Sequence, residues 1–361
     1  MIVSGPHPEA VKAGVEIMDK GGNVIDVAVA TALALTVTGP NYSSLGGGGF
    51  AVIKMNGIKD VLDFRETAPA LATPEMFAKE GASSTVGGLA VGVPGIPAGL
   101  VALHEKYGKL PWQQLFLPAL KLSKNGFRVT RKWIDVVNNE RENFNPKATA
   151  VFLQKGRPYY ATEIHKQPDL YKALVLFRDK KSRGFYGGEV AADVVNTVQK
   201  NKGILSLEDM KNYKVRWLKP LESEFMGHNL VLMPPPSSGG AVLTTALNLV
   251  SQLKPQQYEQ FSTDEYHILS EISSRAFRSR LLLGDPDFHK NPLSIILSKS
   301  FIDDLAKTIS LKKATSLAPI DESKLHESPQ TTHFSVLDKD GNAISMTVTL
   351  NGNFGSGLAS E

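Results

Sequence analysis

The 361-residue sequence contains no cysteine. Thiolate nucleophiles, disulfide bonds and cysteine-based zinc sites are therefore excluded. The eight histidines are scattered and form no closely spaced pair of the kind that binds a metal ion. The sequence accordingly predicts no metal site.

A strong charge imbalance is also missing. There are 40 Lys plus Arg residues against 36 Asp plus Glu residues, a net charge of +4, which is too small over this length to predict a nucleic-acid partner. The most apolar stretch, residues 23–38, is shorter than the roughly 20 residues of a membrane-spanning helix and contains Asp26. This stretch therefore predicts a buried helix and no membrane span.

The N-terminus lacks the basic and apolar segments of a signal peptide. We expect either a cytoplasmic protein or a periplasmic or secreted one from which the signal has been removed. The compartment stays open at this point.

Apolar residues recur at helical spacing over residues 9–20, and Gly21-Gly22 supplies the stop. Asn23, with Asp26 three residues later, predicts the N-terminal cap of a second helix that ends before Gly39-Pro40. Helical periodicity then dominates from about residue 75 to residue 330. Within that range, residues 234–240 are read as the entry to a helix over 241–250.

Two hairpins are expected outside this helical region. Gly46–Gly49 forms a turn before two strands joined at Asn56-Gly57, and it lacks the Gly-Lys-Ser/Thr ending of a phosphate-binding loop. Residues 331–337 and 342–350 alternate and are rich in β-branched and hydroxyl side chains. They predict a second hairpin near the end of the chain.

The turn of this second hairpin determines which residues face each other. If residues 338–342 form a type I turn with the glycine in the left-handed bulge position, Asp338 pairs with Asn342. Thr331 then lies opposite Thr349 on one face of the sheet, whereas a two-residue turn would separate them. Paired threonines contribute only about 0.2–1 kcal/mol in ordinary sheets, so the pattern alone assigns no chemistry.

Several long blocks resemble one family in order along nearly the whole chain. They are SGPHPEAVKAGVEIMDKGGNVIDVAVATALAL, SSLGGGGF, DFRETAPA, VGVPGIPAGLVALHEKYGKLPW, FYGGEV, MPPPSSGG, LGDPDF and QTTHFSVLDKDGNAISMTVTLN. On these blocks the sequence resembles the γ-glutamyltranspeptidases, which are N-terminal-nucleophile hydrolases.

The resemblance implies an α+β fold, an αββα sandwich, made as an inactive precursor that its own threonine cleaves. The QTTH block places the cut between Gln330 and Thr331. Residues 1–330 would form the large-subunit region, largely helical, and residues 331–361 the beginning of the small catalytic subunit. The implied activity is γ-glutamyl transfer and hydrolysis of glutathione or related amides, without a metal or organic cofactor.

The resemblance also implies roles for three further residues. Arg65, in DFRETAPA, would bind the α-carboxylate of the γ-glutamyl group. Thr349 and Asn351, in the TLN block, would support the nucleophile and contact the substrate. The partners would be a γ-glutamyl donor, an amino-acid, peptide or water acceptor, and the two subunits of one precursor.

The sequence departs from the family pattern after the block FGSG. The family's residues for the α-amino group, its serine pair and its Gly-Gly oxyanion hole are not found, so we expect a chain truncated after the first small-subunit hairpin. Two alternatives stay open. One is a related amidase acting on poly-γ-glutamate or, in the manner of cephalosporin acylases, on another amide; the other is an unprocessed, inactive form.

Overall fold

The computed structural model describes residues 1–78, 80–315 and 331–361. These residues divide into two units. The first contains residues 1–58, 62–217 and 331–361, and the second contains residues 59–61 and 218–315.

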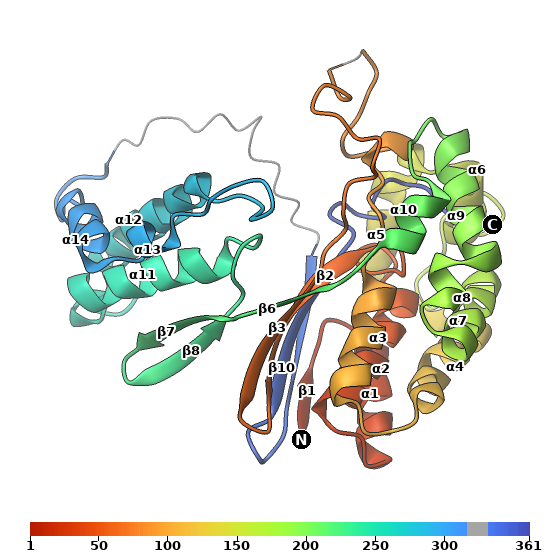
Figure 1. The fold of residues 1–361 in the computed structure, drawn as a ribbon, viewed down its shortest axis with the longest axis horizontal. Coiled ribbons are helices and arrows are strands. Elements are labelled where there is room, and N and C mark those ends of the chain that lie inside the picture. Colours follow the sequence, from red (N-terminus) through yellow and green to blue (C-terminus); the bar gives the residue numbers. More distant parts are fainter. Residues whose placement is uncertain (79, 316–330) are drawn as a thin grey trace. The chain divides into compact units, whose positions relative to one another are not determined.

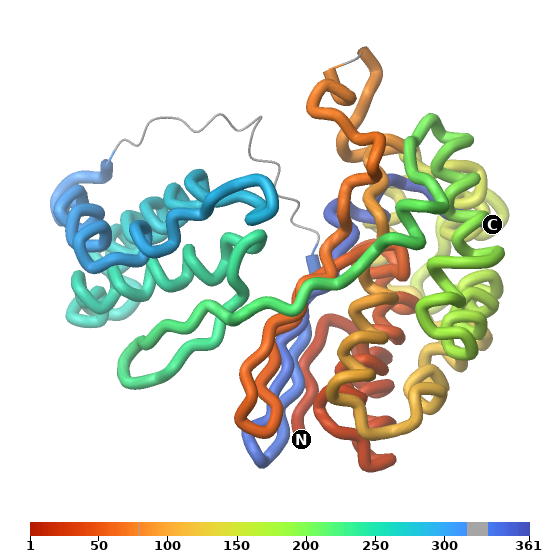
Figure 2. The backbone as a smooth tube through the Cα atoms, viewed as in Figure 1, coloured from red at the N-terminus to blue at the C-terminus, as the bar shows by residue number. Residues whose placement is uncertain are grey.

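The first unit is built around a six-stranded sheet that joins both ends of the chain. Its strands, in spatial order, are β1 (Ile2–Ser4), β9 (Thr331–Leu337), β10 (Ala343–Thr349), β2 (Gly48–Met55), β3 (Ile58–Phe64) and β6 (Arg216–Leu218). β9 pairs antiparallel with β1, and β10 pairs antiparallel with β2. Figure 2 shows the blue C-terminal hairpin between the red and orange N-terminal strands. The two hairpins expected from the sequence are therefore confirmed and share one sheet.

The strands of the C-terminal hairpin separate apolar from hydroxyl side chains. One face carries buried apolar residues of the main core, Phe334, Val336, Ile344, Met346 and Val348. Because side chains alternate along a strand, the other face carries Thr331, His333, Ser335, Ser345, Thr347 and Thr349. We call this second face the hydroxyl face.

Helices cover the apolar face of the sheet (Figure 1). α1 (Pro8–Asp19) packs against α2 (Val24–Thr38), and α2 contacts β9 and β10. Every residue of α2 is buried, as the apolar run predicts. The other helices of this unit are α3 (Ile96–Tyr107), α4 (Leu117–Asn125), α5 (Arg131–Glu140), α6 (Pro146–Phe152), α7 (Pro168–Lys180), α8 (Arg183–Tyr186), α9 (Gly188–Lys200) and α10 (Leu207–Asn212). A small two-stranded sheet pairs β4 (Phe127–Arg128) with β5 (Ile164–His165).

The start of α2 confirms the predicted cap. Asn23 Oδ1 accepts from the backbone N–H of Asp26 at 3.0 Å, and Asp26 Oδ2 accepts from the N–H of Asn23 at 3.1 Å. The same carboxylate also accepts from the N–H groups of Lys109 and Leu110. The hydrogen bonds explain how an aspartate can be fully buried at this position.

The second unit combines a hairpin with a helical layer. β7 (Leu221–Phe225) pairs with β8 (His228–Leu232), and the helices are α11 (Gly239–Leu253), α12 (Thr263–Ser279), α13 (Leu293–Ile296) and α14 (Lys299–Lys307). α11 confirms the helix expected after residues 234–240. The β7–β8 hairpin was not predicted, because the helical periodicity of the surrounding region dominates its two short strands.

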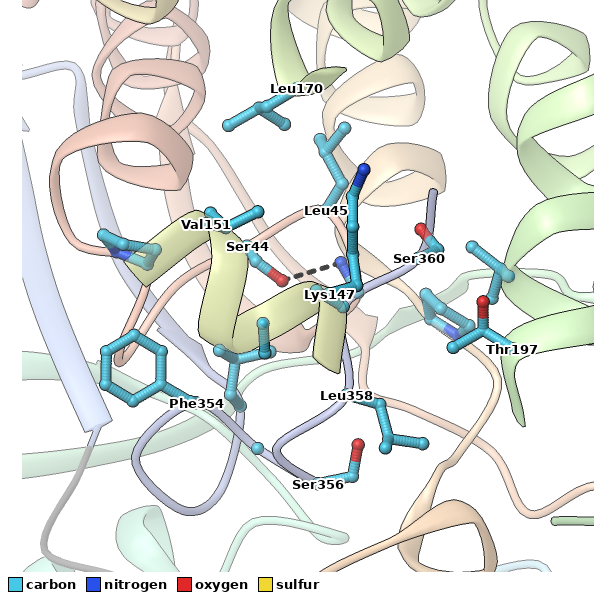
Figure 3. A pocket seen from close by; sticks show the side chains of 18 of the residues that line it. Ser44, Leu45, Lys147, Val151, Leu170, Thr197, Phe354, Ser356, Leu358 and Ser360 are labelled. Atoms are coloured by element: carbon cyan, nitrogen blue, oxygen red, sulfur yellow. Dashed lines mark hydrogen bonds between the residues drawn. The ribbon is translucent and has the colours of Figure 1, made fainter. Parts of the chain in front are cut away.

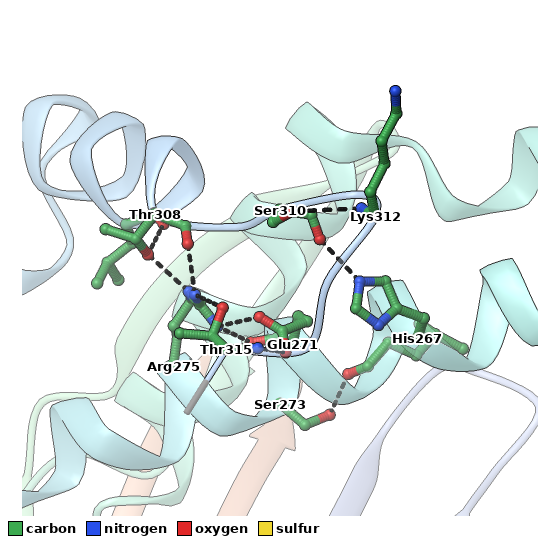
Figure 4. Close-up of polar contacts among 10 residues, drawn as sticks. His267, Glu271, Ser273, Arg275, Thr308, Ser310, Lys312 and Thr315 are labelled. Carbon is green, nitrogen blue, oxygen red and sulfur yellow. Dashed lines mark hydrogen bonds and ion pairs between the residues drawn. The ribbon is translucent and has the colours of Figure 1, made fainter. Parts of the chain in front are cut away.

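A buried ion pair ties this helical layer together (Figure 4). Arg275 and Glu271, both on α12, lie 2.8 Å apart and are 3% and 7% exposed. Arg275 also donates to Thr308 Oγ1 and to the Thr308 carbonyl, and Glu271 accepts from the N–H of Thr315. The charges are thus paired and hydrogen-bonded, as burial requires.

The α+β class expected from the sequence is confirmed. Of the four layers of the expected sandwich, the described part of the first unit supplies one helical layer and one large sheet. No helix among the described residues has the length and apolar character needed to span a bilayer.

Candidate active site

Thr331 and Thr349 face each other at one end of the β9–β10 ladder. The Thr331 hydroxyl donates to Thr349 Oγ1 at 3.2 Å. The register follows from the turn, in which the Asp338 N–H donates to the Asn342 carbonyl at 3.0 Å and Gly341 has φ +78°. The predicted pairing is therefore confirmed, whereas Gln330 lies outside the described residues.

Thr349 is held more firmly than its partner. It is only 2% exposed, and its Oγ1 also accepts from the backbone N–H of Asn351 at 2.8 Å. Asn351 has φ +70°, a left-handed conformation. Thr349 is thus a fixed acceptor that orients the more exposed Thr331 hydroxyl.

A glycine lies next to the threonine pair on the neighbouring strand. Gly48 of β2 lies opposite Thr349. A Cβ atom on Gly48 would lie 2.7 Å from Glu66 Oε2 and 2.7 Å from the Glu66 nitrogen. The missing side chain therefore lets Glu66 pack directly on the strand beside Thr349.

Arg65 lies over the hydroxyl face just after β3. Its guanidinium is 5.8 Å from the centre of the Phe50 ring, and Phe50 lies opposite Thr347. Since Phe50 and Gly48 are two residues apart on β2, they share the face that carries Thr331. The structure thus brings Arg65 and the threonine pair to the same side of the sheet.

Glu66 is a neighbour of Arg65 that the sequence reasoning missed. Arg65 Nε lies 3.4 Å from Glu66 Oε2. Burial raises the pKa of Glu66 above its ordinary value, and the adjacent Arg65 opposes this rise. The sequence signal was present, because Glu66 directly follows Arg65 in the DFRETAPA block.

A cavity of about 670 Å³ opens beside these residues, and its lining includes Arg65, Glu66 and Asn351. Thr331 and Thr349 are not among its lining residues, but Asn351 links the cavity to them through its bond to Thr349. Its volume lies in the range typical of small-molecule sites.

The remaining walls of the cavity come from helices and from the end of the chain. Figure 3 shows Val151 and Lys147 of α6, Leu170 of α7 and Thr197 of α9 around it, with Phe354, Ser356 and Leu358 from the C-terminal segment. Ser44 Oγ accepts from the N–H of Gly46 at 3.0 Å in the loop on the same wall. This part of the cavity is mainly apolar, with Lys147 paired to Asp169 and Glu361.

The family model described as gamma-glutamyltranspeptidase matches residues 10–361. The chain belongs to the gamma-glutamyltranspeptidase family. The resemblance drawn from the sequence blocks is thereby confirmed.

Individual relatives agree with this membership. The chain is 40% identical over 367 residues to a glutathione hydrolase proenzyme of a Pseudomonas species and 36% identical over 369 residues to that of Escherichia coli. Both alignments cover 99% of this chain and 64% of the relative. The chain therefore spans slightly less than two-thirds of the length of these relatives.

Solved structures of relatives have the same fold. The γ-glutamyltranspeptidase of Helicobacter pylori matches with a TM-score of 0.82 at 35% identity, covering 86% of this chain and 91% of that chain. A cephalosporin acylase of Bacillus halodurans matches with a TM-score of 0.88 at 26% identity, covering 99% of this chain and 67% of that chain. The N-terminal-nucleophile hydrolase fold predicted from the sequence is confirmed.

His333 is a second residue that the sequence reasoning missed. It lies two positions after Thr331 on the hydroxyl face. Its Nδ1 is 2.8 Å from Thr347 Oγ1, and its Nε2 is 3.0 Å from Ser345 Oγ. Burial lowers the pKa of His333, which favours the neutral ring in this hydroxyl cluster. Its position in the QTTH block was the available signal.

Metal ligation has no support in the part of the chain that the structure describes. No group of three or more His, Asp or Glu side chains there is arranged to hold a metal ion. Thr331 hydrogen-bonds to the Thr349 hydroxyl, and His333, two positions along β9, hydrogen-bonds to the Thr347 hydroxyl. Hydroxyl groups and an imidazole ring suit hydrogen bonding and proton transfer.

Proposed function

We propose that this protein catalyses γ-glutamyl transfer and hydrolysis of glutathione or related γ-glutamyl amides, with Thr331 as an N-terminal nucleophile released by self-cleavage. The single observation that carries the proposal is the 3.2 Å hydroxyl pair of Thr331 and Thr349, in a chain that belongs to the gamma-glutamyltranspeptidase family. The name proenzyme, given to the relatives, supports a precursor that is cut.

Self-cleavage would begin with attack of Thr331 Oγ1 on the carbonyl carbon of Gln330. The peptide C–N bond breaks as the C–O bond forms, leaving an ester between the two residues and a free α-amine on Thr331. Water then hydrolyses the ester, which frees the carboxylate of Gln330 and restores the hydroxyl. The products would be a large subunit ending at residue 330 and a small subunit that starts at residue 331.

The new α-amine would supply the base that a threonine hydroxyl needs. Its ordinary pKa of about 7.7–8.0 lies close to neutral pH, so roughly a tenth or more of the amine is unprotonated at about pH 7. Thr331 Oγ1 would transfer its proton to this amine while attacking the γ-carbonyl of the donor. The amine of the leaving group departs with a proton, and an acyl-enzyme remains. Water releases glutamate from it, whereas an amino acid or peptide amine forms a new γ-glutamyl amide.

Arg65 would select donors that carry a free α-carboxylate. Its planar guanidinium can form two parallel hydrogen bonds with a carboxylate, which a lysine cannot. Its place over the hydroxyl face and on the cavity wall supports this role. The side-chain amide of Asn351, on the same wall, would contact the substrate next to Thr349.

An acylase function is the second candidate. The chain is 32% identical to the acylase ACY 1 proenzyme of a Pseudomonas species, and the cephalosporin acylase fold matches nearly its whole length. Arg65 favours γ-glutamyl transfer over the acylase function. An acyl group without an α-carboxylate would offer no carboxylate for the Arg65 guanidinium to bind. An unprocessed form would be inactive in either case.

The test uses the protein expressed from its full coding sequence. Thr331→Ala abolishes both self-cleavage and γ-glutamyl anilide hydrolysis, since one hydroxyl performs both attacks, and Thr331→Ser retains part of each. Thr332→Val is the matched control, because Thr332 is buried on the opposite face of β9 and keeps both activities.

Cleavage or hydrolysis that persists in Thr331→Ala would reject the assignment. A panel of γ-glutamyl anilide, glutathione, poly-γ-glutamate and a cephalosporin amide separates the candidate functions. Preference for the cephalosporin amide would favour the acylase.

A further inference from the structure

Both backbone polar groups of Arg65 are bound by side chains. Its N–H donates to Asp63 Oδ1 at 3.0 Å. Its carbonyl accepts from the Tyr213 hydroxyl at 2.7 Å, from a residue 148 positions away in the sequence. These two bonds fix the segment from which the Arg65 side chain projects.

Asp63 is itself held in one orientation. It is only 3% exposed, and its second oxygen, Oδ2, accepts from Arg216 Nε at 3.0 Å and Nη2 at 2.7 Å. Two hydrogen bonds from one guanidinium restrain a carboxylate more than a single bond does. Asp63 Oδ1 is therefore held toward the N–H of Arg65.

Tyr213 is held from its other side by a stacked ring. The rings of Tyr213 and Tyr186 are parallel within 4°, with centroids 5.7 Å apart. A Cβ atom on Gly95 would lie 2.4 Å from the Tyr213 hydroxyl oxygen, so only glycine leaves room for that hydroxyl. Burial, with the carboxylates of Asp63 and Glu66, raises the pKa of Tyr213 well above its ordinary value, so the hydroxyl stays a donor at working pH.

The Arg65 side chain has few direct restraints of its own. Its side chain is 36% exposed, and among the described residues it contacts Glu66 at 3.4 Å and the Phe50 ring at 5.8 Å. A bidentate carboxylate contact requires the guanidinium plane to start from a defined position. The bound backbone fixes the point from which this side chain extends.

We propose that Tyr213, together with the Asp63–Arg216 pair, is a positioning residue that sets the Arg65 guanidinium for the α-carboxylate of the γ-glutamyl donor. This inference rests on the proposed role of Arg65. Tyr213 acts through Arg65 and touches neither the donor nor Thr331. Loss of its hydroxyl therefore weakens donor binding and leaves the acyl-transfer chemistry intact.

The test is steady-state kinetics of Tyr213→Phe on a γ-glutamyl anilide, with the protein expressed from its full coding sequence. KM rises roughly three- to tenfold, the size expected for one lost hydrogen bond. The kcat value and the extent of self-cleavage stay the same, because precursor cleavage involves no free α-carboxylate. In an Arg65→Lys background, Tyr213→Phe adds no further rise in KM.

Tyr186→Phe is the matched control. It removes the hydroxyl of the other ring of the stacked pair. That hydroxyl donates to the Pro94 carbonyl at 2.7 Å and makes no bond to Arg65. Its KM stays at the wild-type value. Arg216→Lys is a second variant. It keeps a positive charge beside Asp63 but cannot donate from two nitrogens of one planar group, and it raises KM as Tyr213→Phe does.

Three results would overturn the inference. An unchanged KM in both Tyr213→Phe and Arg216→Lys, with a raised KM in Arg65→Lys, would refute the positioning role alone. An equal rise in Tyr186→Phe would show a general packing effect. An unchanged KM in Arg65→Lys would refute the carboxylate-binding role of Arg65 and the inference that rests on it.

Discussion

The hydroxyl oxygens of Thr331 and Thr349 lie 3.2 Å apart across the β9–β10 ladder, although 18 positions separate the two residues in the sequence. The tight turn at residues 338–342 produces this pairing, and the buried Thr349 restrains it. A threonine in an open sheet could adopt several side-chain rotamers, but this bond selects the one that turns its hydroxyl toward β10.

Removal of the Thr349 hydroxyl should slow catalysis more than it weakens binding. In Thr349→Val, Thr331 loses its acceptor and the N–H of Asn351 loses its partner. We expect kcat to fall roughly ten- to a hundredfold, which corresponds to about 1.4–2.7 kcal/mol of lost transition-state stabilisation. The kcat value of processed enzyme on a γ-glutamyl anilide is the measurement.

Thr347→Val controls for the general effect of a lost hydroxyl on this face. Thr347 bonds to His333 Nδ1 at 2.8 Å, and its pair with His333 lies two pairs along the ladder from the Thr331–Thr349 pair. An equal fall in kcat in the two variants would contradict a specific role for Thr349.

Replacement of Arg65 by lysine should weaken donor binding and spare self-cleavage. Lysine keeps the positive charge beside Glu66 but cannot form the two-bond contact with a carboxylate. We expect KM for a γ-glutamyl anilide to rise roughly tenfold or more. KM and the fraction of processed chain are measured together, and an unchanged KM would remove Arg65 from the binding site.

Activity should decrease as the pH falls through the pKa of the Thr331 α-amine. Only the neutral amine can accept the hydroxyl proton, and its ordinary pKa is about 7.7–8.0. The measurement is kcat/KM against pH on processed enzyme, next to a direct titration of the labelled amine. A flat profile across the measured titration, with chemistry rate-limiting, would require another residue to be the base.

His165 should make the first unit less stable in acid. It is 0% exposed, and burial lowers its pKa from 6.5 to about 4. The folded state therefore excludes a proton that the unfolded chain binds below pH 6.5, so stability is complete above that value and declines as the pH falls toward about 4. We expect a loss of roughly 2 kcal/mol between about pH 7 and about pH 5.

Urea unfolding followed by tryptophan fluorescence tests this stability effect, since the Trp133 ring lies 5.1 Å from that of His165. His165→Phe should lose this part of the pH dependence of the free energy of unfolding. His228→Phe, at an exposed position of β8, is the control and should retain it. The same pH dependence in His165→Phe and in the wild type would contradict the assignment.

The local features of this fold could be predicted from the sequence. Asn23 and Asp26 indicated a cap because both partners lie within one helical turn. The pairing of Thr331 with Thr349 followed from the turn, since hairpin register depends on turn length. The β7–β8 hairpin was missed, because two five-residue strands carry too little pattern within a helical region.

The contacts between distant segments could not be predicted in this way. No periodicity places Glu66 against Gly48 or the Tyr213 hydroxyl on the Arg65 carbonyl. The first contact depends on the path of the chain after β3, and the second on how the segment after α10 packs against it. The family resemblance identified Arg65 but not the residues that hold it. The expected division at residue 330 concerns covalent processing, and the two spatial units do not test it.

The central claim is that Thr331 becomes the N-terminus of a catalytic subunit. Mass spectrometry and N-terminal sequencing of the protein expressed from its full coding sequence, incubated after purification, test this claim most directly. The account predicts two chains, the second beginning with Thr331-Thr332-His333, and a single uncut chain for Thr331→Ala. A wild-type protein that stays uncut while it hydrolyses γ-glutamyl anilide, or a new N-terminus at any other residue, would contradict it.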